Sequence, residues 1–285
     1  VAVNGNVAVV AEVNSETDFV AKNETFQEFV QTVADTALAS DLNGGANGED
    51  IEALLATNGL SDLLVEKTAT IGEKLSVRRF AKVTGDAVAS YIHGGGRIGV
   101  VIAADGASDD AAKEALTNIA MQVAAMNPQY ISRADMADEE VAKLREITVD
   151  SALNDPASLP KPILNKLIEK AVAGVWSAED VAIYEEKKSN MQYLFNFLSK
   201  EAAAQLAEIA MADKETIAAD KIFNGLVEGR VSKQLKEICL LDQTYVKAED
   251  GKQSVAKYVE QVAKENSAKI AVKGFVRFET GEGIE

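Results

Sequence analysis

The pattern of apolar and polar positions predicts an alternation of valine-rich strands and one-sided helices. Residues 7–13 are rich in valine and follow an Asn-Gly pair, which is typical of a strand entered from a hairpin turn. Apolar residues then recur every three or four positions over about 26–40, and this spacing predicts an amphipathic helix. Shorter helices are expected over 49–70, and a strand over 75–83.

A second stretch repeats this order. It predicts a strand over 87–93, a glycine turn at 94–96, a strand over 97–104 and a helix over 109–126. The repeat is weak, but it indicates two similar α+β subdomains. A last strand is expected over 269–279, where it can join the sheet of the second subdomain.

The region between these mixed segments is helical in pattern. The four prolines all lie between residues 127 and 163, and from about 161 to 238 apolar residues repeat at helical spacing with little strand signal. A helical hairpin or small bundle inserted between strands accounts for this pattern. Trp176 lies in it and is interpreted as a packing anchor. The expected domains are subdomain N, subdomain C in two segments, and a helical insert within it: residues 1–85, 86–155 with 240–285, and 156–239.

Composition and charge exclude several classes of function. The 285 residues include 29 Lys and Arg against 45 Asp and Glu, a net charge of −16. Such a surface repels a phosphate backbone, so direct nucleic-acid binding is not expected. No apolar run approaches the ~20 residues needed to cross a bilayer. Cys239 is the single cysteine, which suits a reducing cytoplasm. Because the chain starts at Val1, some N-terminal sequence is expected to lie outside it.

The residues for covalent chemistry are scarce. His93 is the single histidine, and Cys239 lies far from it in an apolar stretch, so neither a Cys-His pair nor a zinc site is indicated. The glycine-rich segment 94–99 is followed by a strand, whereas a dinucleotide-binding turn opens a helix. A hairpin turn is therefore the favoured interpretation, and a phosphate-ligand enzyme stays as an alternative. No cofactor or metal is expected.

The segment around Phe19 has two interpretations. Thr17 or Asp18 can cap a helix, and Phe19 lies seven residues before Phe26, so its ring can extend the apolar stripe into the core. Alternatively, the ring is a wedge for another protein. Local pattern alone favours the core, although the polar residues 22–25 interrupt the stripe.

Four segments together resemble one known family. These are Thr-Asp-Phe-Val-Ala-Lys-Asn at 17–23, Ile-Gly-Glu-Lys-Leu-Ser-Val-Arg-Arg at 71–79, Tyr-Ile-His-Gly-Gly-Gly-Arg-Ile-Gly-Val at 91–100, and the end of the chain from 274. In this order they resemble the motifs of bacterial elongation factor Ts, with the helical insert only weakly matched. The resemblance implies two pseudo-symmetric α+β subdomains with small antiparallel sheets flanked by helices, and a coiled-coil-like helical excursion. It also implies a small N-terminal helical domain, which this chain is expected to lack.

The resemblance also implies a function and a set of contact residues. The family binds elongation factor Tu in its GDP form and promotes GDP release in translation elongation, without covalent chemistry. Carried over by motif, Phe19 is a wedge near the Mg²⁺ site of the partner, and Thr17, Asp18 and Val20 support it. The remaining implied contacts are Ile71 and His93. The resemblance thus reverses the core interpretation of Phe19, while a helical scaffold that docks proteins without exchange stays as an alternative.

Overall fold

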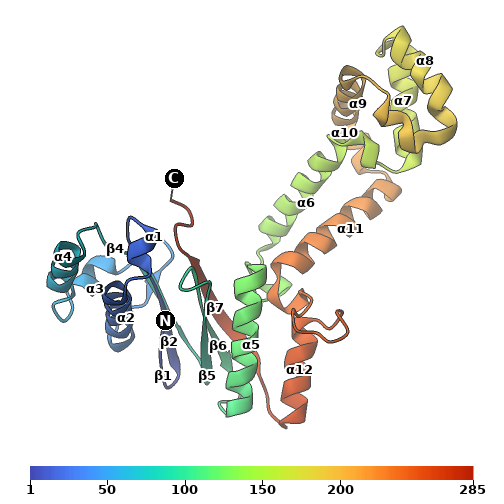
Figure 1. The fold of residues 1–285 in the computed structure, drawn as a ribbon. Coiled ribbons are helices and arrows are strands. Elements are labelled where there is room, and N and C mark those ends of the chain that lie inside the picture. Colours follow the sequence, from blue (N-terminus) through green and yellow to red (C-terminus); the bar gives the residue numbers. More distant parts are fainter. Residues whose placement is uncertain (285) are drawn as a thin grey trace. The chain divides into compact units, whose positions relative to one another are not determined.

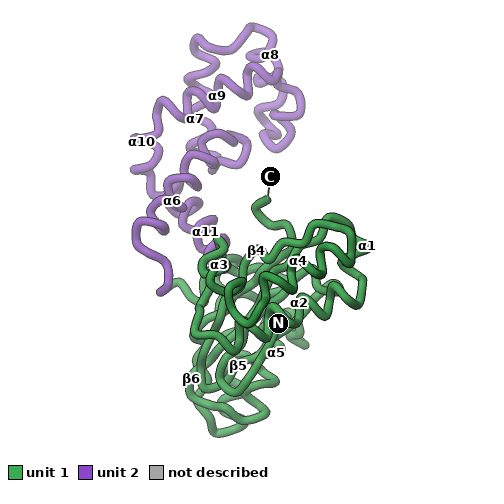
Figure 2. Tube along the Cα trace, turned by 90° about the vertical axis from the view of Figure 1, so that its left-hand side faces the viewer, with its two compact units in different colours: residues 1–133, 237–285 green, residues 134–236 purple. Residues whose placement is uncertain are grey.

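The computed structural model describes residues 1–284, and these divide into two compact units (Figure 2). The core unit comprises Val1–Arg133 and Glu237–Glu285, and the helical unit comprises Ala134–Lys236. The predicted α+β class is confirmed, because helices accompany two small antiparallel sheets. The finer division of the core at residue 85, and the insert boundaries at 156 and 239, stay predictions.

The first sheet of the core unit has the strand order β1-β2-β4-β3, and Figure 1 labels β1, β2 and β4. Its strands are β1 Ala2–Asn4, β2 Val7–Asn14, β3 Gly44–Gly45 and β4 Ser76–Thr84. The long pair β2 and β4 is antiparallel and has a register shift between Glu12 and Val13. The helices in this half are α1 Asp18–Ala21, α2 Glu24–Ala39, α3 Ile51–Leu55 and α4 Leu60–Ile71.

The second sheet has the order β5-β6-β7, with all pairs antiparallel. Its strands are β5 Ala87–His93, β6 Ile98–Asp105 and β7 Ala271–Glu279, and its helices are α5 Asp110–Met126 and α12 Val255–Glu265. The hairpin predicted at 94–96 is confirmed, since β5 and β6 pair from His93 with Ile98 onward. The last strand does join this sheet, as expected, by pairing with β6.

Among its described residues, the core unit has three hydrophobic clusters, because its central strands are buried on both faces. On β2, Val9 faces α2 and α4 with Phe29 and Phe80, whereas Val10 faces the second sheet with Val101. The third cluster joins the second sheet to α5 and α12. Each fully buried apolar side chain contributes about 1.5–3 kcal/mol. Burial on both faces explains why β2 and β6 read as continuous apolar runs rather than as alternating ones.

The helical unit is built from helices and 3₁₀ turns. They are α6 Asp138–Leu153, η2 Pro156–Ser158, α7 Lys161–Gly174, α8 Ala178–Lys187, η3 Lys188–Asn196, α9 Lys200–Ala212, α10 Lys214–Ala218 and α11 Lys221–Ile238, the last of which runs on into the core unit. Trp176 is buried and its Nε1–H donates to the carbonyl of Ala202 at 3.0 Å, which confirms the packing anchor. No described helix has both the length and the apolar character of a membrane span.

Two local expectations differ from the structure in this unit. Apolar spacing over 191–198 indicates a regular helix, but η3 is a 3₁₀ segment interrupted at Asn190 (φ −135°, ψ 71°). The helix α6 has no counterpart among the predicted elements. Its buried residues all lie in its second half, from Thr148 to Leu153, so its apolar stripe is too short to show a helical period.

Candidate functional site

A one-turn helix carries the most exposed large apolar side chain that the structure describes. Phe19, on α1, is 88% exposed. The N-cap of α1 is Thr17, whose Oγ1 accepts from the N–H of Val20 at 3.4 Å. The interpretation of Phe19 as a core residue is therefore wrong, and the ring is free to contact another molecule.

A second cap explains why the ring leaves the apolar stripe. Asn23 Oδ1 accepts from the N–H groups of Thr25 at 2.8 Å and Phe26 at 3.3 Å, so α2 starts as a separate helix. Side-chain oxygens of this kind satisfy the free N–H groups of a helix start. Phe26 is buried beneath the first sheet, but Phe19 belongs to the preceding turn and points elsewhere.

The other residues of the motif differ in exposure. Thr17 and Asp18 are exposed, whereas Val20 is half-buried and packs against the cluster formed by the first sheet and α2. Val20 therefore attaches α1 to the core, and the neighbouring ring of Phe19 projects into solvent.

A pair of carboxylates fastens this motif to the segment that follows α4. Glu73 accepts from Thr17 through both oxygens, from the N–H at 3.1 Å and from Oγ1–H at 2.7 Å. In return, the N–H of Lys74 donates to Glu16 Oε2 at 3.2 Å. Sequence reasoning did not single out Glu73 or Glu16, although both lie in or beside the quoted motifs. Their partners are more than 50 residues away, beyond any local spacing.

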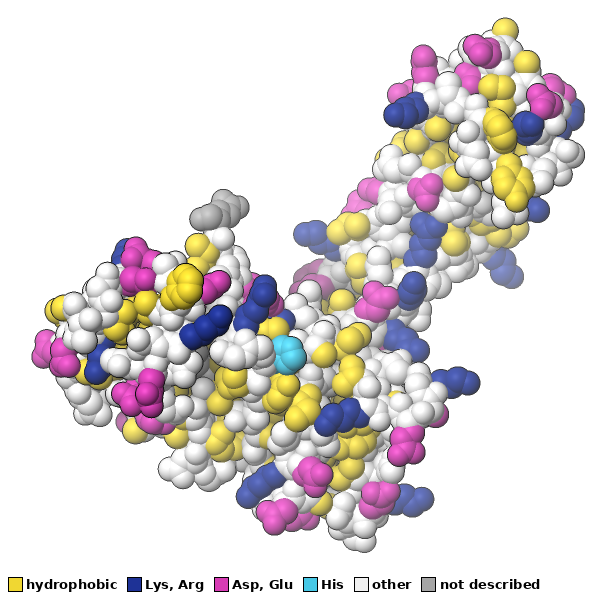
Figure 3. All heavy atoms as spheres, viewed as in Figure 1, with side chains coloured by type: hydrophobic (Ala, Val, Ile, Leu, Met, Phe, Trp, Pro, Cys, Tyr) yellow, Lys and Arg dark blue, Asp and Glu magenta, His cyan; other side chains and the backbone are white. Residues whose placement is uncertain are grey.

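The two remaining predicted contacts lie on different elements. Ile71 ends α4 and is half-buried against the first-sheet cluster. His93 ends β5 and is exposed, with its Nδ1 3.1 Å from the hydroxyl of Tyr91. Figure 3 shows the face that carries the single histidine, drawn in cyan, with apolar side chains around it.

A groove of about 1050 Å³ brings part of the motif next to the β5–β6 hairpin. Its lining includes Thr17, Asp18, Gly94 and Arg97, together with Ile92, which is 44% exposed. Phe19, Val20, Ile71 and His93 do not line it. The structure thus joins the first and third motifs at one surface, with Phe19 and His93 each next to a lining residue.

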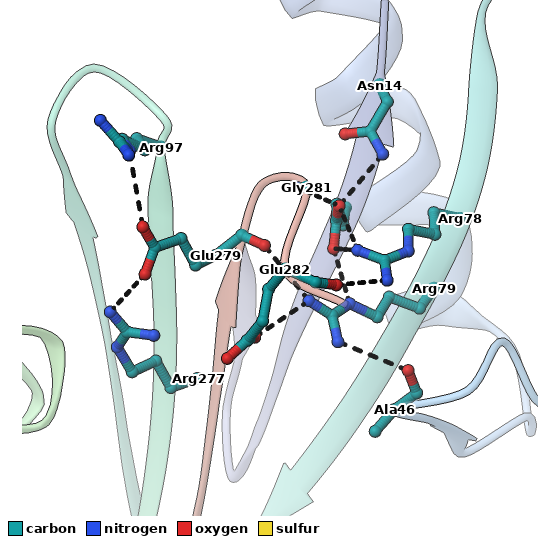
Figure 4. Close-up of polar contacts among 10 residues, drawn as sticks. Asn14, Ala46, Arg78, Arg79, Arg97, Arg277, Glu279, Gly281 and Glu282 are labelled. Atoms are coloured by element: carbon teal, nitrogen blue, oxygen red, sulfur yellow. Dashed lines mark hydrogen bonds and ion pairs between the residues drawn. The ribbon is translucent and has the colours of Figure 1, made fainter. Parts of the chain in front are cut away.

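An ion-pair cluster lies at the base of the motif, where β2, β4 and the chain after β7 meet (Figure 4). Glu12 is buried, and its carboxylate accepts from Arg79 Nε at 2.6 Å, Arg78 Nη1 at 2.9 Å and the N–H of Gly281 at 3.1 Å. The guanidinium of Arg79 also lies over the ring of Phe278, 4.1 Å from its centroid. The cluster therefore ties both sheets together directly before the motif begins.

Together, the hydrogen bonds to Glu12 lower its pKa by more than burial raises it. Burial alone raises the pKa of a carboxyl group, because it disfavours the charged form. Here hydrogen bonds from Arg78, Gly281, Asn14 and Arg79 more than compensate, so the pKa of Glu12 lies below its ordinary value of 4.5. The carboxylate is ionised at neutral pH and holds both arginines.

The groups available for metal binding or nucleophilic chemistry are few around these residues. Among residues 1–284, no group of three or more His, Cys, Asp or Glu residues could hold a metal ion. Cys239 is buried, whereas His93 is exposed on the hairpin. The ring of Phe19, exposed on a capped turn whose neighbours Thr17 and Asp18 line the groove, is accessible to another molecule.

Comparison with known proteins identifies the family. Residues 16–282 match the family model described as elongation factor TS. The elongation factor Ts of Clostridioides difficile (strain 630) is 38% identical over 289 residues, covering 99% of this chain and 73% of that relative. The chain belongs to the elongation factor Ts family. It is a nucleotide exchange factor for elongation factor Tu in translation elongation, and it is not an enzyme.

Proposed function

We propose that α1 is the element that disturbs the Mg²⁺ and phosphate site of elongation factor Tu, in the cytoplasm, and so releases GDP. Phe19 acts as the wedge, with Thr17, Asp18 and Val20 in support. The observation that carries this proposal is the ring of Phe19, which is 88% exposed on a turn capped at its start and anchored by Val20.

The exposed ring of Phe19 can gain binding free energy by entering a pocket of the partner. Aromatic side chains dominate the binding energy of many interfaces when they enter a pocket of the partner. A bound Mg²⁺ is the largest local charge at a phosphate site, so moving it weakens the hold on a diphosphate. Binding of the exchange factor and of GDP to the GTPase then oppose each other, and by linkage each lowers the affinity of the other by the same factor.

Ile71 and His93 are proposed as further contacts with the partner. Ile71 packs in the same cluster as Val20, so the end of α4 and the helix α1 share one support. His93 precedes Gly94, which lines the groove together with Thr17 and Asp18. These positions support a contact surface that runs from α1 to the β5–β6 hairpin.

The experiment compares Phe19→Ala with Val65→Ala. Val65 is 67% exposed on α4 and lies outside the proposed contacts, so it controls for loss of an exposed apolar side chain. Release of fluorescent GDP from elongation factor Tu is measured by stopped flow at several concentrations of each variant. We expect Phe19→Ala to slow release by about 30-fold or more, the level of a dominant interface residue, and Val65→Ala to leave it unchanged.

The thermal unfolding of both variants is measured alongside. Because the ring of Phe19 is exposed, its removal should leave the unfolding temperature unchanged. A lowered unfolding temperature with normal GDP release by the folded protein would contradict the wedge.

A further inference from the structure

We propose that Glu73 is a positioning residue for exchange: it holds α1 in the orientation that presents Phe19 to the partner. This inference rests on the proposed role of Phe19. It assigns a function to the second motif, at 71–79, that is separate from direct contact with elongation factor Tu.

The helix α1 cannot hold its own conformation. It has four residues, and none of them is buried. Isolated helices of this length do not form in water, because the first turn fixes several residues for a single hydrogen bond. The half-buried side chain of Val20 is its attachment to the core cluster, so the remaining order must come from polar contacts.

Glu73 supplies such contacts at the N-cap of α1, and Gln27 supplies another at the opposite end, where its Nε2–H donates to the carbonyl of Ala21 at 3.3 Å. Thr17 Oγ1 donates to Glu73 Oε1 while it accepts from the N–H of Val20, so the carboxylate fixes the rotamer that caps α1. The other oxygen, Oε2, accepts from the N–H of Thr17 and fixes the backbone at the same residue. Charge-assisted bonds of this kind are stronger than neutral ones. Without the carboxylate, the side chain of Thr17 that caps α1 and the backbone at Thr17 both lose their acceptor.

The position of Glu73 is itself fixed by the end of α4. Gly72 closes α4 with a φ of 80°, a left-handed conformation that glycine adopts without strain, and its N–H bonds to Thr68. Ile71 packs into the first-sheet cluster directly before this turn. The reciprocal bond from Lys74 to Glu16 holds the two segments together on the other side of Glu73. The Glu73 carboxylate thus connects α1 to a segment that the core holds in place.

The test uses Glu73→Ala, Glu73→Gln and a control, Glu66→Ala. The glutamine variant can still accept from the Thr17 N–H and donate to Oγ1, so it should retain part of the clamp. Glu66 is exposed on α4 and outside the clamp, so its removal controls for a change of charge. Each variant is combined with the native Phe19 and with Phe19→Ala, and fluorescent GDP release from elongation factor Tu is measured.

We expect Glu73→Ala to slow exchange by about 3- to 10-fold, the net effect of losing one ordinary hydrogen bond, because both bonds from Thr17 are exposed to water. Glu73→Gln should fall between Glu73→Ala and the native chain, and Glu66→Ala should have no effect. In the Phe19→Ala background, Glu73→Ala should cause no further loss, because the ring that it positions is absent. Hydrogen exchange of peptides covering 17–23 should be faster in Glu73→Ala, with the β2 and β4 amides unchanged.

The outcomes separate this inference from the proposed function. An equal loss in both Phe19 backgrounds would show that Glu73 contacts the partner itself and would overturn the positioning role. Normal GDP release or unchanged hydrogen exchange at 17–23 in Glu73→Ala would also overturn it. If Phe19→Ala alone has no effect on GDP release, the wedge role of Phe19 is refuted. The positioning role of Glu73, which depends on it, is then refuted as well.

Discussion

Replacing the buried Glu12 by glutamine should destabilise the core unit strongly. The Glu12 side chain is 2% exposed and that of Arg79 is 7% exposed, so their ion pair is shielded from water, whereas Arg78 is 22% exposed. Glutamine keeps the length of the side chain and one acceptor oxygen. Its NH₂ group, however, must face an arginine N–H, because both Glu12 oxygens accept from guanidinium groups.

The magnitude follows from the burial of the cluster. Removing one partner of a buried ion pair costs about 3–5 kcal/mol, since it leaves an uncompensated charge. Arg78 can regain water and the amide oxygen still accepts one bond, so we expect the lower end, about 3 kcal/mol. For a unit of this size, each kcal/mol lowers the unfolding temperature by about 2–4 °C, which predicts a decrease of roughly 6–12 °C.

The pH dependence of this loss has a defined sign. The pKa of Glu12 is lowered in the folded chain from its ordinary value of 4.5. A group of this kind stabilises fully above its unfolded pKa, and the stabilisation is lost as pH falls through the folded pKa. The difference in unfolding free energy between the native chain and Glu12→Gln should therefore be constant above pH 4.5 and shrink below it.

The assay is urea unfolding at a series of pH values, followed by far-UV circular dichroism. Fluorescence of Trp176, the single tryptophan, follows the helical unit separately. Glu52→Gln is the matched control, because Glu52 is exposed on α3 of the same unit. A cost below about 1 kcal/mol at neutral pH, the range of exposed ion pairs, would refute the reasoning. So would a cost that stays constant from pH 7 into the acid range.

Two further substitutions test other parts of the fold. Gly44→Ala should destabilise the core unit by clearly more than Gly59→Ala in urea unfolding. Both glycines have positive φ, but the new Cβ at Gly44 would overlap the backbone oxygen of Phe80, whereas the new Cβ at Gly59 would meet open space. Equal costs would show that the β3 edge yields. Asp180→Ala should lower the unfolding free energy of the helical unit by about 1–3 kcal/mol, because the N–H of Ser199 loses its acceptor. The backbone hydrogen bond from Ser199 lowers the pKa of Asp180, although burial opposes this shift. The loss of unfolding free energy in Asp180→Ala, followed by tryptophan fluorescence, should therefore diminish below pH 3.8. A loss that is unchanged in acid would contradict this expectation.

The longer strands and most helices could be predicted from the sequence because their signals are local, whereas the short strands β1 and β3 were not predicted. The valine runs of β2 and β6 and the glycine turn between β5 and β6 are visible in short windows. The helix α6 gave no such signal, since only its second half is buried. The 3₁₀ segment η3 has helical spacing but a non-helical residue at Asn190, which spacing does not reveal.

The polar contacts around the site could not be predicted in the same way. Glu12 and Arg79 are 67 residues apart in the chain, and Thr17 and Glu73 are 56 apart. Acidic residues are common in this chain, so nothing in its local sequence distinguishes a buried carboxylate from a solvated one. Only the antiparallel pairing of β2 with β4 brings these residues together, and the register of that pairing depends on the whole sheet.

The pairing of β2 with β4 also explains how the stable core unit can hold the short helix α1 in one orientation. The β2–β4 pair is fixed at one point by the buried cluster of Glu12 and Arg79, and where the strands end it continues into the segments that carry Thr17 and Glu73. Burial decreases along this path, from a buried ion pair to exposed hydrogen bonds and then to a four-residue helix with no buried residue. Glu12→Gln should therefore lower the unfolding free energy of the core unit, whereas Glu73→Ala should slow GDP release and leave that free energy unchanged. Normal exchange by Glu73→Ala, with the unfolding of the core unchanged, would mean that α1 is held by its own contacts and not through Glu73.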